Sequence, residues 1–251
     1  MHPFFTSSRP LVFAHRGGSA LAPENTVDAF ANGLSLGADG IELDVRLSLD
    51  GVVVVHHDAT VDRTTAGRGA VAALTAVELA RLDVPALGDV LARFRDTRVI
   101  VELKVNSAEF ARAVVDVVRR ADAVDRICLG SFGLRVLRTA RALEPAIATS
   151  AAREEVRWAL YRSWVGWPAR RAPYAGFQVP ELAGTTRVVS RRFVDAAHRA
   201  GHGVQVWTVD TEDDARRLLA WGVDALITDR PDLIVPVVRE VPEVPEVRGR
   251  F

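Results

Sequence analysis

Short apolar runs alternate along the chain with segments of helical period. Between most of the runs, apolar residues recur three and four positions apart, as at Phe110, Val114 and Val117, which predicts amphipathic helices. Alternation of strand and helix is typical of parallel βαβ units, and eight such units predict an α/β fold that closes into a (β/α)₈ TIM barrel. The eight expected strands are Leu11–His15, Gly40–Val45, Arg98–Val105, Arg126–Ser131, Ala146–Ser150, Ala175–Val179, Val204–Thr208 and Asp224–Thr228.

A ninth apolar run, Val52–His56, follows the second expected strand too closely for a parallel crossover, which needs a dozen or more residues. An Asp-Gly dipeptide stands between the two runs, so we predict a β-hairpin that extends the second strand. Pairing of Val45 with Val55 would bring the chain that follows back to the level of Asp44.

Three segments lie outside the strand–helix repeat. Residues 58–90 are rich in Thr, Gly and Ala, and we expect a small insertion there. Residues 151–174 are rich in aromatic side chains. Residues 237–251 contain prolines that disfavour a helix, so we expect an extended C-terminal arm after a single barrel domain over residues 1–236.

The composition narrows the class of protein. A chain of 251 residues fits one α/β barrel. The 32 basic and 32 acidic side chains cancel, which disfavours a nucleic-acid partner. A single cysteine, Cys128, excludes an internal disulfide and a multi-cysteine zinc site. With neither a signal-peptide pattern nor a long apolar span, we expect a cytoplasmic location.

Acidic residues interrupt two of the apolar strands. Alternation places Glu42 and Asp44 on the face of their strand opposite Ile41 and Leu43, and Glu102 is placed in the same way on a later strand. An isolated buried carboxylate is very costly, so three that converge at the barrel mouth predict one divalent cation. Oxygen ligands favour Mg²⁺ or Ca²⁺. The alternative interpretation is an ion-pair network, for example of Glu102 with a neighbouring Arg46 or Lys104.

Basic residues and histidines surround these carboxylates. Arg16 and Lys104 place positive charge beside the expected cation, a combination that suits a phosphate ester. One histidine would take a proton from the nucleophile and another would protonate the leaving alkoxide. His15 and His57 are the candidates, and His56 competes with His57 because adjacent strand residues face opposite sides.

Motifs of several other chemistries do not occur. The sequence has no nucleophile elbow, no zinc-protease helix motif, no Walker loop and no dinucleotide fingerprint. Paired carboxylates also occur in glycosidases, but the nearby basic and histidine residues favour phosphate.

The charged strand ends belong to an ordered series of blocks that resembles the glycerophosphodiester phosphodiesterase family, from about Leu11 to Leu233. The matching blocks are Ala14-His15-Arg16-Gly17-Gly18, Pro23-Glu24-Asn25-Thr26, Gly37-Ala38-Asp39-Gly40-Ile41-Glu42-Leu43-Asp44-Val45, His57-Asp58, Asp62-Arg63-Thr64-Thr65, Glu102-Leu103-Lys104, Ser131-Phe132, Val206-Trp207-Thr208-Val209 and Ile227-Thr228-Asp229-Arg230-Pro231.

The resemblance implies a barrel that hydrolyses glycerophosphodiesters, small-molecule substrates, to sn-glycerol 3-phosphate and an alcohol with the help of Ca²⁺ or Mg²⁺. The attacking group would be water or the neighbouring glycerol hydroxyl. By motif, the acid–base pair would be His15 and His57, and this favours His57 over His56. The implied cation ligands are Glu42, Asp44 and Glu102, and the implied substrate contacts are Arg16, Lys104 and Trp207.

Two alternatives remain open at this point. The segment Trp158–Trp167 either packs as the fifth barrel helix with a loop or contacts a membrane surface, which would favour a phosphodiesterase of the lysophospholipase D type. A barrel that binds phosphodiesters without turnover is the other alternative. The sequence does not specify an oligomeric state.

Overall fold

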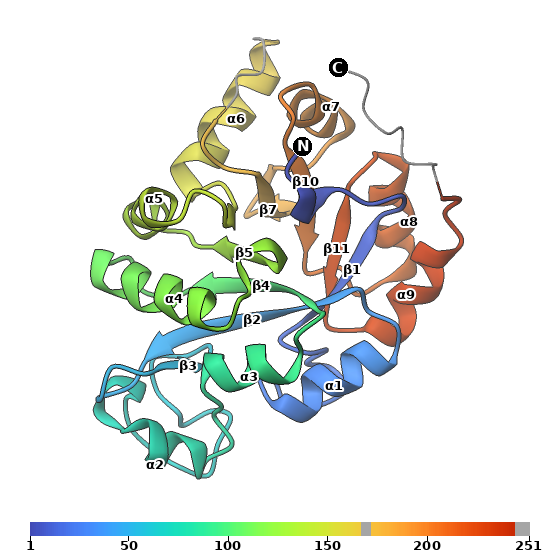
Figure 1. Cartoon of the computed structure of the whole chain (residues 1–251). Coiled ribbons are helices and arrows are strands. Elements are labelled where there is room, and N and C mark those ends of the chain that lie inside the picture. Colours follow the sequence, from blue (N-terminus) through green and yellow to red (C-terminus); the bar gives the residue numbers. More distant parts are fainter. Residues whose placement is uncertain (167–171, 244–251) are drawn as a thin grey trace.

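Eight parallel strands form a nearly closed barrel in the computed structural model, which describes residues 1–166 and 172–243 (Figure 1). The strands run in the spatial order β6-β5-β4-β2-β1-β11-β10-β7. Between β6 and β7 the gap is closed by a single bridge, Ser150 to Gly176, and by backbone hydrogen bonds beside it. The strands are β1 (Leu11–His15), β2 (Gly40–Leu47), β4 (Arg98–Leu103), β5 (Ile127–Gly130), β6 (Ala148–Thr149), β7 (Gly176–Pro180), β10 (Gly203–Trp207) and β11 (Ala225–Thr228).

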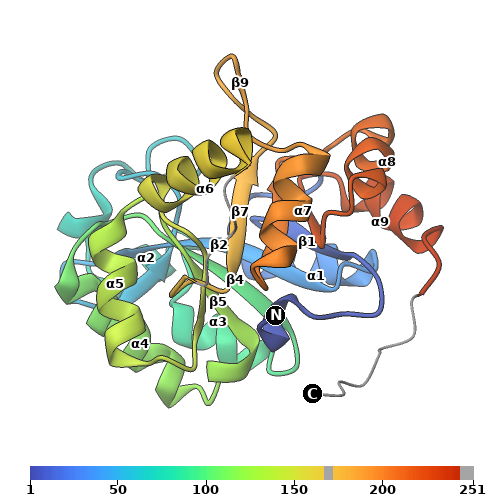
Figure 2. The same ribbon diagram turned by 90° about the horizontal axis from the view of Figure 1, so that it is seen from above.

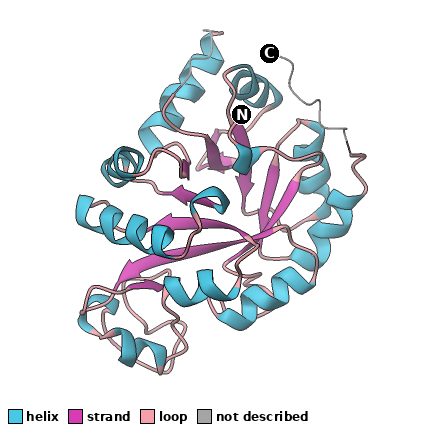
Figure 3. Ribbon diagram, in the orientation of Figure 1, coloured by secondary structure: helices cyan, strands magenta, loops and turns pink. Residues whose placement is uncertain are grey.

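An outer layer of helices surrounds the barrel, as Figure 3 shows by colour. In α4 the side chains of Phe110, Val114 and Val118 are fully buried against the sheet, as their spacing predicts, and the Ser107 hydroxyl caps the first turn. The predicted α/β barrel is thereby confirmed. The helices of this layer are α1 (Val27–Ser35), α3 (Leu87–Arg93), α4 (Ala108–Arg120), α5 (Leu134–Leu143), α6 (Arg153–Val165), α7 (Arg191–Arg199), α8 (Glu212–Ala220) and α9 (Pro231–Arg239).

Aromatic side chains close one end of the barrel. The short helix η1 (Pro3–Phe5) places Phe5 against Gly176 and Gly203, the first residues of β7 and β10. A Cβ atom at either glycine would lie only 2.5 Å from the Phe5 ring, so glycine permits this close approach. Because Phe5 fills the end where the strands begin, the opposite end remains for a site.

The predicted hairpin is present. Strand β3 (Val53–Val55) pairs antiparallel with β2, and Val45 lies opposite Val55. The turn contains Gly51, whose φ of +77° suits glycine. The His56 N–H then donates to the Asp44 carbonyl at 2.8 Å, so the following residue, His57, lies beside the end of β2.

A small subdomain follows the hairpin. It contains η2 (Val71–Ala73) and α2 (Ala76–Ala80) around a separate apolar cluster that includes Val61 and Leu79. The predicted insertion at 58–90 extends too far, because α3 already begins at Leu87 and packs in the main core.

Two further segments differ from expectation. The predicted arm from residue 237 is wrong at its start, since α9 runs to Arg239 in spite of Pro236. Val237 and Val238 are buried in the core, and their burial offsets the hydrogen bond that the proline removes. The sequence pattern also missed the exposed hairpin of β8 (Leu182–Ala183) and β9 (Thr186–Arg187).

The aromatic segment contains the fifth helix of the outer layer, α6, between β6 and β7 (Figure 2). The expected fifth helix is therefore present over the described residues, and Trp167 lies outside them. The helix η3 (Val124–Arg126) precedes β5. None of the helices within the described ranges has the length and apolar character needed to cross a membrane.

Candidate active site

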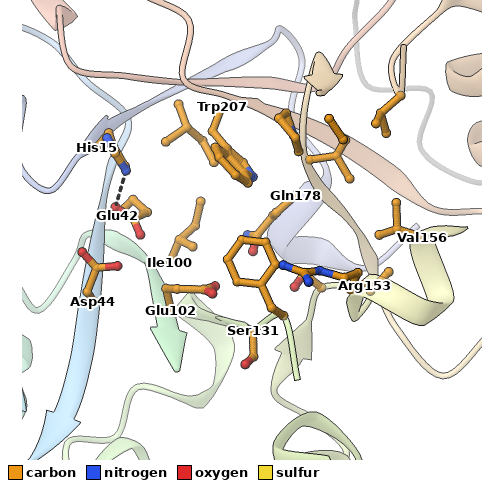
Figure 4. A pocket seen from close by; sticks show the side chains of 18 of the residues that line it. His15, Glu42, Asp44, Ile100, Glu102, Ser131, Arg153, Val156, Gln178 and Trp207 are labelled. Atoms are coloured by element: carbon orange, nitrogen blue, oxygen red, sulfur yellow. Dashed lines mark ion pairs between the residues drawn. The ribbon is translucent and has the colours of Figure 1, made fainter. Parts of the chain in front are cut away.

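All eight residues predicted for the site line one cavity of about 670 Å³ at the ends of the strands. Figure 4 shows His15, Glu42, Asp44 and Glu102 on one side of it. The eight residues are His15, Arg16, Glu42, Asp44, His57, Glu102, Lys104 and Trp207.

Strand register brings the acidic residues together. His15 on β1 lies beside Glu42 on β2, and Asp44 lies beside Glu102 on β4. Partners in adjacent parallel strands point to the same side, so all four side chains face the barrel axis. Their apolar neighbours, such as Leu43, pack outward against the helices.

Asp44 is held by two cations. Lys104 Nζ lies 2.7 Å from Asp44 Oδ1, and Arg16 Nε lies 3.1 Å from Oδ2. The amide of Asn25 donates to the same carboxylate at 2.9 Å, and its oxygen accepts the Asp44 N–H. Burial opposes ionisation, but Lys104 and Arg16 outweigh it and hold the pKa of Asp44 below its ordinary value.

Glu42 and Glu102 are less well compensated. Burial, with the charge of Asp44 added, raises the pKa of Glu42 to about 7. Burial also raises the pKa of Glu102 to about 8. Ionising both groups in this cavity therefore needs more positive charge than Lys104 and Arg16 provide.

The donor set fits a hard divalent cation. Carboxylate oxygens are the ligands that Mg²⁺ and Ca²⁺ prefer, and a cation would lower the raised pKa values of Glu42 and Glu102. Within residues 1–166 and 172–243, no three acidic, histidine or cysteine side chains converge closely enough to hold an ion. Asp44, which the sequence predicts as a ligand, forms an ion pair with Lys104 in this structure.

His15 is oriented by a carboxylate from the last strand. Its Nδ1 lies 2.7 Å from Oδ1 of Asp229, just beyond β11, and its Nε2 lies 3.7 Å from Glu42 Oε2. The Ser19 hydroxyl also donates to Asp229. Burial lowers the pKa of His15, but Glu42 and Asp229 outweigh it, so that the pKa is raised.

His57 is oriented in the same way from the hairpin side. Its Nδ1 lies 2.7 Å from Asp58, whose other oxygen accepts from Arg63 at 2.6 Å. Arg63 pairs with Glu24, and Glu24 pairs with Arg16. Partial burial lowers the pKa of His57, against the opposing effect of Asp58.

The neighbouring histidine does not face the cavity. His56 is buried, and its Nε2 contacts the carbonyl of Thr60 at 3.0 Å. The structure therefore places His57, and not its competitor His56, beside the carboxylates.

The carboxylates that orient the histidines were missed by the sequence reasoning. The role of Asp58 could have been predicted from the sequence, because this residue directly follows His57. Asp229 follows Thr228 at the end of the last strand, but only the barrel closure brings it to His15. Gln178 and Phe132 also line the cavity, and the Phe132 ring meets Trp207 edge to face at 6.1 Å.

Together these groups form an acid–base site with a positively charged wall. Two imidazoles, each held through Nδ1 by a carboxylate, leave Nε2 for proton transfer. The pKa of His15 is raised and that of His57 is lowered, which suits the first to donate and the second to accept a proton. Arg16 and Lys104 provide charge for an anionic substrate.

Comparison with known families gives a match over most of the chain. Residues 15–233 match the Glycerophosphoryl diester phosphodiesterase family. A glycerophosphodiester phosphodiesterase of Caldanaerobacter subterraneus is 31% identical over 92% of this chain and 99% of its own length. A probable glycerophosphodiester phosphodiesterase 2 of Mycobacterium tuberculosis is 34% identical over 91% of this chain and 90% of its own length.

Solved structures agree in fold. A phosphodiesterase of Oleispira antarctica, in complex with the product sn-glycerol-3-phosphate, has a TM-score of 0.75 and 27% identity, and covers 92% of this chain and 97% of its own. A putative glycerophosphoryl diester phosphodiesterase of Silicibacter pomeroyi has a TM-score of 0.79 at 24% identity, and covers 96% of this chain and 98% of its own.

Proposed function

Because the chain belongs to the glycerophosphoryl diester phosphodiesterase family and is an enzyme of that class, we propose that it releases sn-glycerol 3-phosphate and an alcohol by metal-dependent, two-histidine catalysis. The observation that carries this proposal is the pair of carboxylate-held histidines, His15 and His57, on one cavity with three buried or half-buried acidic residues. A non-catalytic barrel and a glycosidase do not fit the family.

The two histidines transfer the protons of the reaction. One Nε2 accepts a proton from the attacking water or glycerol hydroxyl, whose oxygen bonds to phosphorus. The other donates a proton to the leaving oxygen as its bond to phosphorus breaks, so the alcohol leaves neutral. Asp229 and Asp58 keep each Nδ1 occupied, which fixes the tautomer of His15 and His57.

The basic residues stabilise negative charge on the phosphoryl group. Arg16 and Lys104 lie beside Asp44 at the cavity wall, and Asp44 holds both in place through ion pairs. Their charge favours the more anionic transition state. Trp207 adds an aromatic wall for the glycerol or the alcohol.

Glu42, Asp44 and Glu102 would hold one Mg²⁺ or Ca²⁺, the divalent cation that the resemblance of their sequence blocks to this family implies. When bound, the cation supplies Lewis-acid stabilisation of a non-bridging phosphate oxygen. The cytoplasmic location expected from the sequence stays a prediction.

Release of glycerol 3-phosphate from glycerophosphocholine, measured by a coupled assay, tests the proposal. We expect turnover with Mg²⁺ or Ca²⁺, none with chelator, and a loss of at least about a hundredfold in His15→Ala and His57→Ala. His56→Ala is the matched control, since its side chain points away from the cavity. Turnover that persists in chelator, or equal losses in His56→Ala and His57→Ala, would contradict the proposal.

A further inference from the structure

The cavity has a second half with a different character. Beyond the charged residues it is lined by apolar side chains from α6, from β7 and the segment after β9, and from the loop after β5. Figure 4 shows Val156 of α6 across the cavity from His15 and Glu42. Small glycerophosphodiesters are polar along their whole length and would leave this half without a complementary group. The residues concerned are Phe132, Val156, Leu160, Trp164, Val179 and Val188.

Helix α6 carries apolar residues on two faces. Val156, Leu160 and Trp164 recur every four residues and line the cavity. Trp158 and Tyr161 point to the outside and contact each other edge to face at 6.3 Å. Trp164 lines the cavity and is 55% exposed, so the apolar surface continues through this side chain to the solvent. Trp158, which lines a separate, smaller cavity beside α7, is 66% exposed.

Exposed aromatic side chains are concentrated here. Within the described ranges they are Trp158, Tyr161 and Trp164 on α6 and Phe132 at the cavity. The hairpin of β8 and β9 lies at the same end of the molecule and adds an exposed Leu182 (Figure 2). A cluster of this kind around a cavity mouth marks an interaction surface.

Two arginines of α6 add positive charge at this mouth. Arg153 and Arg157 line the cavity, are exposed, and form no ion pair with a described residue. Arg153 also lies over the Phe132 ring, at 5.0 Å. Exposed tryptophans beside unpaired arginines complement a surface of anionic phospholipid headgroups.

We propose that the substrate is a glycerophosphodiester with one acyl chain, a lysophospholipid, which the enzyme takes from a lipid surface. The acyl chain occupies the apolar half of the cavity, the phosphodiester lies at His15 and His57, and α6 contacts the lipid. The products are the acylglycerol phosphate and the headgroup alcohol. The oxygen from water joins phosphorus, the bond from phosphorus to the headgroup oxygen breaks, and that oxygen gains a proton.

This inference rests on the proposed phosphodiesterase chemistry, and a chain-length series separates the two. The series compares glycerophosphocholine with its 1-hexanoyl and 1-octanoyl derivatives, as monomers and with the metal present. Each methylene buried in the apolar half should raise kcat/KM about fourfold. Val156→Thr should reduce that gain, whereas Val77→Thr on the distant α2 should not.

The outcomes of the series are distinct. Turnover of glycerophosphocholine with no gain from the acyl chain would overturn the lysophospholipid inference and leave the phosphodiesterase proposal intact. No turnover of any member would refute the phosphodiesterase proposal itself. An equal gain in Val156→Thr and wild type would also overturn the inference.

Sedimentation with vesicles of phosphatidylcholine and phosphatidylglycerol tests the lipid contact. We expect the wild type to bind and Trp158→Ser to bind about tenfold more weakly. Leu49→Ser is the control, because Leu49 is 62% exposed in the β2–β3 turn away from the cavity. Equal binding of Trp158→Ser and wild type would overturn the inference. So would a dimer that dissociates in Trp158→Ser, since α6 would then be buried between two copies.

Discussion

Replacement of Glu102 by glutamine should stabilise the metal-free protein while removing its activity. Burial raises the pKa of Glu102 to about 8 from an ordinary value of 4.5. Between these two values the folded protein retains a proton that the unfolded chain releases. The free energy of unfolding therefore falls as the pH rises through this window, and it is unaffected below it.

The magnitude follows from the width of the window. One pKa unit corresponds to about 1.4 kcal/mol, and from pH 5 to pH 7 this group destabilises the wild type by about 2 to 3 kcal/mol. The glutamine side chain of the variant carries no charge at either pH, and the fixed difference between an acid and an amide cancels when the two pH values are compared. The stability of Glu102→Gln relative to wild type should therefore increase by about 2 to 3 kcal/mol over this range.

Urea unfolding at pH 5 and pH 7, in the presence of chelator, measures this change. Glu154→Gln is the matched control, because Glu154 is exposed at the start of α6. The stability difference between this variant and the wild type should be the same at pH 5 and pH 7. Saturating Mg²⁺ or Ca²⁺ should then stabilise the wild type more than the variant. A difference between Glu102→Gln and wild type that stays constant from pH 5 to pH 7 would refute the burial reasoning.

Three further changes have defined outcomes. Asp229→Asn removes the charge that fixes the His15 tautomer, so kcat should fall about tenfold or more in a steady-state assay, and an unchanged kcat would exclude this role. Phe5→Ala empties the closed end of the barrel and should lower the free energy of unfolding by about 3 to 5 kcal/mol in urea; a loss under about 1 kcal/mol would contradict the packing. The hydrogen bond to Asp224 raises the pKa of His198. His198→Gln should therefore lower the free energy of unfolding by about 0.5 to 1 kcal/mol at pH 5.5 and by less at pH 8.5, because the stabilisation by the charged imidazole is lost as the pH rises through the raised pKa. An equal loss at both pH values would refute this stabilising role of the charged imidazole.

The elements of the barrel could be predicted because their signals are local. The β2–β3 hairpin follows from two apolar runs around an Asp-Gly turn, and its register brought His57 to the level of Asp44 as expected. Alternation along β2 and β4 likewise placed Glu42 and Glu102 on the inner face.

The partners of the site residues could not be predicted in this way. Asp229 reaches His15 across 214 positions of sequence, and only the pairing of β1 with β11 brings them together. The pairing of Lys104 with Asp44 depends on side-chain geometry at the barrel mouth, which spacing does not encode. The helical start of the expected arm depends on burial of Val237, which outweighs the local effect of proline.

Phosphorus NMR of glycerophosphocholine hydrolysis in ¹⁸O-labelled water, with Mg²⁺ or Ca²⁺ present, examines the bond that this site breaks. We predict that phosphorus appears in glycerol 3-phosphate with one labelled oxygen, that choline is released unlabelled, and that His57→Ala gives neither product. Formation of phosphocholine, label in the released alcohol, or no hydrolysis by the wild type would contradict a glycerophosphodiesterase that acts through His15 and His57.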